Sequence, residues 1–285
     1  MTEKTNNNEI AKDPQRLAVL ARIDEYERKG WFSKDVEDDP PTIPLEPEKT
    51  DYLCKKFSNK ILRIVVYAIA RHFIHKIIRN KQMIIKDVVG LENFVKLRKS
   101  GLIMTCNHFN AFDNFAVYHV IEKVLPHRKM YKVIREGNYT SFPGMYGLFF
   151  RHCDTLPLSS KFSTMKLFIK SMDVLLRRGE KVLVYAEQGM WWNYRKPRPL
   201  TPGAFKFAVT SNVPVLPFFI TMSDSDIIGG DGFPVQEYTV HILEPIYPDP
   251  KLSEKENIEM MREKNYQMWK DVYEKTYGIP LEYLK

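Results

Sequence analysis

Short apolar runs alternate with helix-length segments along most of this chain, from Asp87 to its end, and this alternation restricts the fold more than any other feature. Strands separated by helices usually pair in parallel, because each helix carries the chain back to the edge where the previous strand began. The sequence therefore predicts an α/β fold over residues 87–285, with a mixed or mostly parallel sheet flanked by helices and a helix at the C-terminus. We expect strands near residues 102–106, 130–134, 154–158, 182–186, 214–220 and 238–244, and helices near residues 112–124, 161–178, 202–211 and 253–276.

The first 51 residues differ from the rest in charge. Residues 1–51 contain 13 acidic and 8 basic side chains, whereas the whole chain has a net charge of +8. A short amphipathic helix is expected over Pro14–Trp31, since its apolar residues follow a helical spacing. Asp35–Pro47 is acidic and rich in proline, which predicts a linker or an arm lying over the domain. We therefore expect residues 1–51 to be an acidic N-terminal extension with a Pro-rich linker.

The next stretch, residues 52–86, is strongly basic and contains nine Lys and Arg residues but no acidic one. A helix is expected from Lys56 to Lys81, and its charges leave no room for the about 18 uncharged residues of a membrane-spanning helix. One interpretation is a basic amphipathic helix lying in a membrane interface; the other is a core-packing helix with a solvated basic face. The predicted apolar face consists of Leu62, Val66, Ile69, Phe73 and Ile77, and the opposite face of Lys60, Arg71, His75 and Arg79.

His108 and Asp113 form the strongest candidate for chemistry. His108 follows the apolar run Gly101–Cys106, and Asp113 stands five residues further on, where a helix is expected to begin. A carboxylate at this place can bind one imidazole nitrogen and leave the other as a base, which can deprotonate a hydroxyl that attacks an acyl carbonyl. The alternative is that both residues only cap the following helix.

Other classes of site have less support in the sequence. Cys54, Cys106 and Cys153 have no metal-ligand spacing and are expected to be reduced thiols in a cytosolic setting. His72 and His75 are three residues apart but have no acidic or Cys partner nearby, and His119, His127 and His152 show no ligand spacing, so we predict no metal site. No signal peptide is expected, because Met1–Asn8 is polar. Without a Gly-rich phosphate loop or a Gly-x-Ser-x-Gly elbow, a nucleotide-binding enzyme or a serine hydrolase has no support.

Four blocks of sequence, taken in order, resemble those of the glycerolipid acyltransferases, the lysophosphatidic acid acyltransferase-like enzymes that include 1-acyl-glycerol-3-phosphate acyltransferase. The resemblance covers roughly residues 86–220 and implies that residues 87–285 are an acyltransferase domain. Four ordered blocks are far more specific than any single one. The blocks are Asn107-His108 with Asp113, Phe142–Arg151, Val184–Glu187 and Val213–Pro217.

The resemblance also suggests which residues contact substrate. It implies that His108 is the catalytic base and Asp113 its orienting partner, while Asn107 either touches substrate or is a plain turn residue. Arg135 stands where the family carries a basic residue that faces the acceptor's phosphate; the alternative is a surface Arg paired with Glu136. Leu156-Pro157-Leu158, however, is followed by Ser159-Ser160 where the family usually has an Arg, and Lys161 is the nearest replacement.

The third block departs further from the family. Its Pro-Glu-Gly-Thr-Arg is replaced by Ala186–Met190, so Glu187 is kept but the phosphate-binding Arg is not. Arg195, Lys196 and Arg198 follow within a dozen residues, and a loop could bring one of them to the same anion. Trp191 and its aromatic neighbours would wall an acyl channel or lie at a membrane interface; alternatively they pack the loop, and the cations are solvated.

We therefore expect an O-acyltransferase of phospholipid biosynthesis. It would move a fatty acyl group from acyl-CoA or acyl-carrier protein to the hydroxyl of a lysophospholipid such as 1-acyl-glycerol-3-phosphate. The thioester is already activated, so no metal or bound cofactor is needed. The expected partners are this donor, this acceptor and an anionic membrane surface, and the expected location is the cytoplasmic face of a membrane, as a peripheral or monotopic protein.

Two alternatives remain. One is a different acceptor, either glycerol 3-phosphate or another lyso-lipid, and the other is a non-catalytic lipid-binding protein of the same fold. A nucleic-acid-binding module is disfavoured, because the chain has no recognised nucleic-acid motif.

Overall fold

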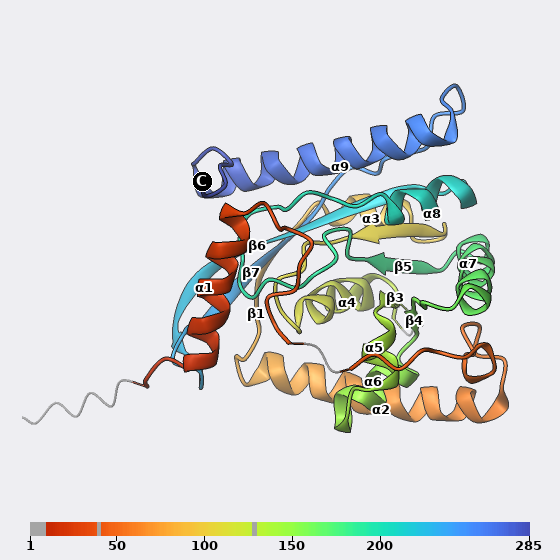
Figure 1. Cartoon of the computed structure of the whole chain (residues 1–285), viewed down its shortest axis with the longest axis horizontal. Coiled ribbons are helices and arrows are strands. Elements are labelled where there is room, and N and C mark those ends of the chain that lie inside the picture. The colour runs from red at the N-terminus through yellow and green to blue at the C-terminus, as the bar shows by residue number, and fades with distance from the viewer. Residues whose placement is uncertain (1–9, 39–40, 127–129) are drawn as a thin grey trace, which may run out of the picture.

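The computed structural model describes residues 10–38, 41–126 and 130–285, and its centre is one seven-stranded sheet of order β1-β7-β6-β2-β5-β3-β4 (Figure 1). Strands β6, β2, β5, β3 and β4 are parallel to one another, β7 is antiparallel to β6, and β1 is parallel to β7. The predicted α/β class with a mixed, mostly parallel sheet is therefore confirmed. The strands are β1 (Ile84–Val89), β2 (Leu102–Thr105), β3 (Met130–Ile134), β4 (Thr155–Pro157), β5 (Lys181–Val184), β6 (Val215–Ile228) and β7 (Pro234–Ile242).

Helices cover both faces of the sheet, as expected where central parallel strands are buried on both sides. Alternate residues of β2 separate the two cores: Leu102 and Met104 pack with α2, α3 and α4, whereas Ile103 packs with α7, α8 and α9. Figure 1 shows α9 along the top of the molecule and α2 along the bottom. The helices are α1 (Pro14–Arg28), α2 (Phe57–Arg79), α3 (Leu91–Lys96), α4 (Asp113–Val124), α5 (Glu136–Thr140), α6 (Gly144–His152), α7 (Phe162–Arg177), α8 (Gly203–Ser211) and α9 (Glu254–Tyr277), with a 3₁₀ turn at Pro47–Lys49.

The N-terminal extension lies against the domain. After α1, an arm (residues 31–38 and 41–46) crosses in front of the sheet towards α5 and the start of α2 (Figure 1). Val36 of the arm is fully buried, in a small core with Ile23 of α1 and Trp191. The prediction of an arm lying over the domain thus describes this segment better than a linker does.

The predicted apolar face of helix α2 is partly packed and partly exposed. Val66 and Ile77 of this face are buried, together with Ala70 and Ile74, while Leu62 and Ile69 are exposed. The helix is apolar around most of its circumference in its first half, so periodicity alone does not identify the stripe that packs. The apolar residues exposed on this helix are Phe57, Ile61, Leu62, Ile64, Val65 and Ile69.

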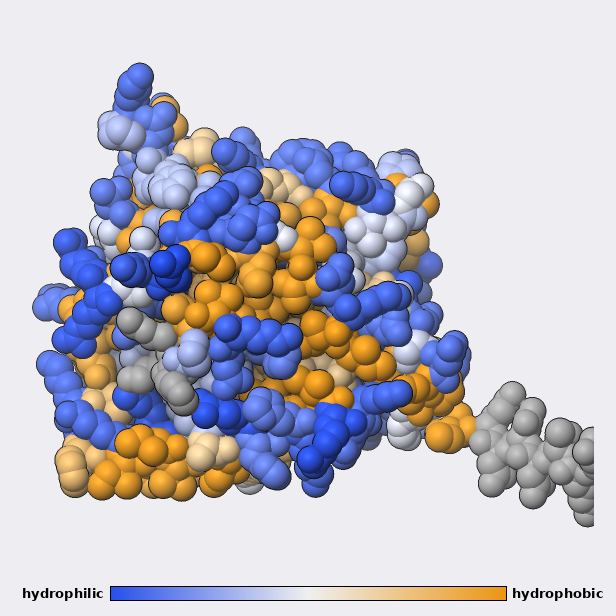
Figure 2. Space-filling model, turned by 180° about the vertical axis from the view of Figure 1, so that it is seen from behind, coloured by the Kyte–Doolittle hydropathy of each residue, from blue (hydrophilic) through white to orange (hydrophobic). Residues whose placement is uncertain are grey.

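This exposed stripe is visible from behind. Figure 2 shows apolar side chains gathered along the lower edge of the molecule, where α2 lies. Phe57 and Ile64 are the most open, with relative exposures of 76% and 71%. Within the described residues, no helix is both long and apolar enough to cross a membrane.

Candidate active site

His108 lies beyond the C-terminal end of β2, in the turn that leads into α4. Its Nδ1 donates a hydrogen bond of 2.7 Å to Oδ2 of Asp113, the first residue of α4. The same oxygen accepts the backbone N–H groups of Phe109 (3.1 Å) and Asn110 (3.3 Å), so the carboxylate fixes the turn as well as the ring. Since Nδ1 donates to the carboxylate, Nε2 is the basic nitrogen, and the side chain of His108 is 22% exposed. This is the geometry of a general base and its orienting carboxylate.

Tyr185 completes the surroundings of this pair. Its hydroxyl donates to Oδ1 of Asp113, and its ring stacks on His108 with 3.8 Å between ring centroids and an interplanar angle of 17°. Burial, followed by the charge of Asp113, raises the pKa of Tyr185 well above its ordinary value, so the hydroxyl remains a donor at neutral pH. Sequence reasoning missed Tyr185 because it looked like a strand residue; its place two residues before Glu187 in the third block was the available signal.

Asn107 and Glu187 hold the His108 turn against its neighbours. The amide of Asn107 donates to Ile220 O (3.0 Å) and accepts from Ile220 N (2.8 Å), which ties the turn to β6. Glu187 Oε2 accepts the backbone N–H of His108 over 3.0 Å. Both side chains are buried and satisfied within the protein. Their proposed contacts with substrate stay predictions.

Arg198 is the cation of the basic run that is buried next to the His108 turn. Its guanidinium donates to Glu187 Oε2 (2.9 Å), Gly189 O (2.5 Å) and His108 O (3.3 Å), and its own backbone N–H donates to Glu187 Oε1 (2.7 Å). Arg198 therefore links the loops that follow β2 and β5. The basic run Arg195–Arg198 was the signal in the sequence, but spacing does not show which of its cations turns inward.

Trp191 packs between the His108 turn and the arm. Its backbone N–H donates to His108 O (3.0 Å), its indole N–H donates to Lys34 O (2.8 Å), and its ring stacks on Phe32 with 5.9 Å between centroids. The residue is fully buried. This position agrees with the alternative in which Trp191 packs the loop.

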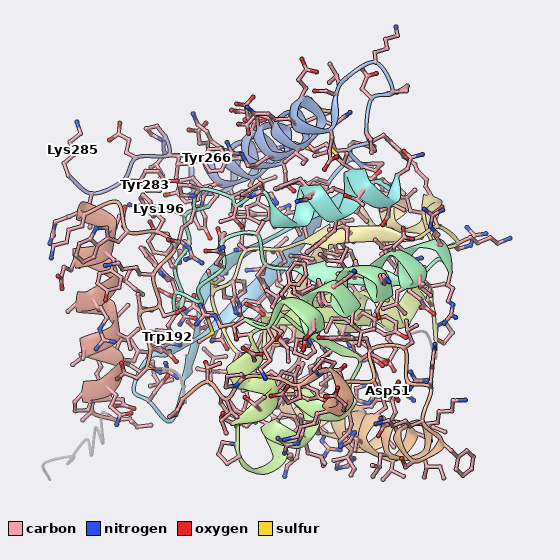
Figure 3. The ribbon with its side chains drawn as sticks, turned by 45° about the vertical axis from the view of Figure 1, so that its right-hand side comes forward. Asp51, Trp192, Lys196, Tyr266, Tyr283 and Lys285 are labelled. Atoms are coloured by element: carbon pink, nitrogen blue, oxygen red, sulfur yellow. The ribbon has the colours of Figure 1, made fainter. Side chains whose placement is uncertain are left out.

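The three cations predicted to bind phosphate are each paired with a carboxylate. Arg135, just before α5, pairs with Asp35 of the arm. Arg195 pairs with Asp224 of β6 at 2.6 Å, and Lys196 pairs with Glu27 of α1 at 2.6 Å. Figure 3 shows Lys196 near Tyr283, close to α1 and on the far side of the molecule from Asp51.

Glu136, the alternative partner for Arg135, instead clamps the arm. Its carboxylate accepts the backbone N–H of Leu45 (2.6 Å), the hydroxyl of Ser159 (2.6 Å) and both the hydroxyl (2.9 Å) and the N–H (3.2 Å) of Ser160. Burial alone would raise the pKa of Glu136, but the hydrogen bonds from Ser159, Leu45 and Ser160 together lower it below its ordinary value. The side chain is thus held as an anion.

The described residues contain no group of three or more His, Cys, Asp or Glu side chains arranged to hold a metal ion. Cys106 and Cys153 are free, buried thiols.

Residues 86–221 match a family model described as Acyltransferase. The chain is also similar to a crystal structure of the 1-acyl-sn-glycerophosphate (LPA) acyltransferase, PlsC, from Thermotoga maritima, with a TM-score of 0.54 and 16% sequence identity. That match covers 94% of this chain and 97% of the other, and at this identity it concerns the fold. No curated protein matches the sequence.

Proposed function

This chain belongs to the glycerolipid acyltransferase family through its O-acyltransferase domain at residues 86–221, and on this basis we propose that it acylates a lyso-lipid of the membrane. The donor is an acyl thioester, either acyl-CoA or acyl-carrier protein. The acceptor is the free hydroxyl of a lysophospholipid or a related lyso-lipid. The hydrogen bond between His108 Nδ1 and Asp113 Oδ2 carries the proposal, because it leaves Nε2 as a base at a partly exposed position.

The reaction is a direct acyl transfer. His108 Nε2 takes the proton of the acceptor hydroxyl as that oxygen attacks the thioester carbonyl, which forms a tetrahedral oxyanion. The C–S bond then breaks, the proton on His108 passes to the leaving thiolate, and an ester and a free thiol remain. Asp113 stabilises the imidazolium formed in between, and Tyr185 and Glu187 keep the ring and its turn in place.

Helix α2 supports a position on the cytoplasmic face of a membrane, as a peripheral or monotopic protein. Its exposed stripe, from Phe57 to Ile69, has no packing partner among the described residues, and nine cations without an acid lie in residues 52–86. Apolar side chains of this kind insert at the headgroup boundary, while cations bind anionic lipids. Both the acceptor and the product of the proposed reaction are lipids, so such a site brings the enzyme to its substrate.

The test is transfer of labelled palmitate from palmitoyl-CoA and from palmitoyl-carrier protein to a panel of lyso-lipids. We expect His108→Ala to abolish transfer to every acceptor while the protein stays folded by circular dichroism. His119→Ala, on the same helix as Asp113 but outside the site, is the matched control and should retain activity. Equal turnover by His108→Ala and the wild type would contradict the proposal.

A further inference from the structure

Five cations in the segments that follow β3, β4 and β5 are each paired with a carboxylate. Ligands in sheets of this kind bind beyond the carboxyl ends of the parallel strands, which is the end that these segments leave. Three of the five carboxylate partners come from the N-terminal extension rather than from the domain. The pairs are Arg135–Asp35, Lys161–Glu46, Lys196–Glu27, Arg195–Asp224 and Arg198–Glu187.

The pair Arg135–Asp35 stands at the carboxyl end of β3, on the same edge of the sheet as His108. Arg135 follows β3, which is separated from β2 by β5 alone, so the two strands lie about 10 Å apart, within reach of a small headgroup. Asp35 also touches the loop after β5, because a Cβ on Gly189 would stand 2.8 Å from its Oδ1. Gly189 O in turn accepts a hydrogen bond from Arg198, which also binds His108 O.

The arm is held firmly at this place. Phe32 O accepts a hydrogen bond from Arg198 (2.9 Å), and Lys34 O accepts one from the indole of Trp191 (2.8 Å). Val36, next to Asp35, is fully buried, and its carbonyl accepts a hydrogen bond from Arg22 (2.8 Å). Asp35 is therefore held at a fixed position beside the site, because the residues on both sides of it are anchored.

We propose that the N-terminal extension makes the headgroup end of the site electrically neutral, so that the acceptor is a lyso-lipid whose headgroup carries no net charge. A phosphomonoester carries a charge of about −1.5 to −2 near neutral pH and would need unpaired cations to replace its water. At this site it would meet Asp35 beside Arg135 instead. The inference rests on the proposed function and narrows its acceptor.

The first experiment compares three acceptors with the full-length wild type: 1-oleoylglycerol, oleoyl-lysophosphatidylcholine and oleoyl-lysophosphatidic acid. We expect kcat/KM for at least one of the two neutral acceptors to exceed that for lysophosphatidic acid by about 10-fold or more, the value of one charged hydrogen bond. A preference for lysophosphatidic acid that is lost in Arg135→Ala would overturn the inference.

The second experiment removes the charge of Asp35. Asp35→Asn should raise kcat/KM for lysophosphatidic acid by about 10-fold relative to the neutral acceptors, because this carboxylate then no longer competes with phosphate oxygens for the Arg135 guanidinium. Glu37→Gln is the matched control: it removes one charge from the same arm, but its partner is Arg16 of α1, at 2.6 Å, so acceptor preference should not move. An equal rise on all three acceptors would mean that Asp35 obstructs the site as a whole, and no rise on lysophosphatidic acid would mean that the pair is structural; either result overturns the inference.

A binding measurement separates this inference from the proposed function. Calorimetry with glycerol 3-phosphate should detect no binding to the wild type and measurable binding to Asp35→Asn, whatever the activity. Strong binding by the wild type would refute the neutral site even if transfer depends on His108. Absence of His108-dependent transfer to any acceptor would instead refute the proposed function.

Discussion

The Asp113 carboxylate receives more donors than any other group around His108. Oδ2 accepts the imidazole and two backbone N–H groups, and Oδ1 accepts the hydroxyl of Tyr185. An amide cannot accept all of these, because its NH₂ group would face a donor. We expect Asp113→Asn to lower kcat at least ~100-fold with little change in KM for the donor, as befits loss of a positioned base. Steady-state kinetics with palmitoyl thioester checks this, and a loss of less than 10-fold would leave Asp113 as a helix cap.

The Tyr185 hydroxyl holds the Asp113 carboxylate that binds His108. We expect Tyr185→Phe to lower kcat by about 10-fold with little change in KM, because one hydrogen bond to a charged group is lost. Tyr238→Phe, a buried tyrosine packed on Phe109 with 5.2 Å between ring centroids, is the control and should keep its kcat. Steady-state kinetics checks this, and equal kcat values in the two variants would contradict the role of the Tyr185 hydroxyl.

At the scale of single residues, the sequence predicted the members of the candidate site that lie close together along the chain. His108 and Asp113 lie within six residues, so one turn brings them together, and the third block placed Glu187 beside them. The sequence did not show which cation of Arg195, Lys196 and Arg198 turns inward, because this depends on how the loop of residues 188–197 folds back. Arg198 is buried beside Glu187, whereas Arg195 and Lys196 pair with Asp224 and Glu27, which no local pattern connects to them.

The exposed apolar stripe of helix α2 leads to a prediction about membrane binding. Ile61→Glu/Val65→Glu places two carboxylates in the exposed stripe without touching a buried residue. Binding to vesicles that contain anionic lipid should fall at least about 10-fold, since each apolar side chain removed from water contributes about 1.5 kcal/mol or more. High salt should weaken the wild type only in part, because the apolar contribution is not screened.

The control for α2 is Ile279→Glu, a similarly exposed apolar position that follows the end of α9 by two residues. Helix α9 and helix α2 lie on opposite sides of the molecule (Figure 1). The Ile279→Glu variant should sediment with vesicles like the wild type. Equal sedimentation of all three proteins would show that the stripe does not bind membranes.

Glu136 connects the arm to α5 and to the loop after β4, and it should make stability depend on pH. Its pKa is lower in the folded chain than in the unfolded one, so the folded state favours the anion. The stabilisation is present above the ordinary carboxyl pKa of about 4.3 and is lost as the pH falls through the folded-state pKa. We expect Glu136→Gln to lower the free energy of unfolding by about 1–3 kcal/mol at pH 7. In urea titrations the difference should shrink towards pH 3, and a constant difference would contradict the clamp.

Most of the predicted elements agree with the structure to within a few residues, including the short strands β2, β4 and β5. The main exception is β6, which was expected to end near residue 220 and continues to Ile228. Strand β1 and helices α3, α5 and α6 were missed, because short segments contain too few repeats to distinguish a helix or strand from a loop. For α2, the helix was predicted correctly, and its predicted apolar face is divided between buried and exposed residues.

Local sequence patterns predicted little of how the helices and strands are arranged in the whole molecule. Alternating strands and helices predicted a parallel sheet, but the order that places β5 between β2 and β3 depends on packing over the full domain. The Arg135–Asp35 pair joins residues 100 positions apart in the chain. An acidic, Pro-rich stretch predicts an arm, and only the folded structure shows which cations it meets.

The catalytic residues and the residues that we propose to select the acceptor lie in different parts of the chain. The base and its partners lie within residues 86–221, the part shared with other acyltransferases, but Asp35, Glu46 and Glu27 lie outside it. Chains with nearly identical domains and different leader segments would then keep one chemistry and differ in substrate. Exchanging about fifty N-terminal residues between two such chains should therefore also exchange their acceptor preference. An alignment of the catalytic domain alone would not predict this preference.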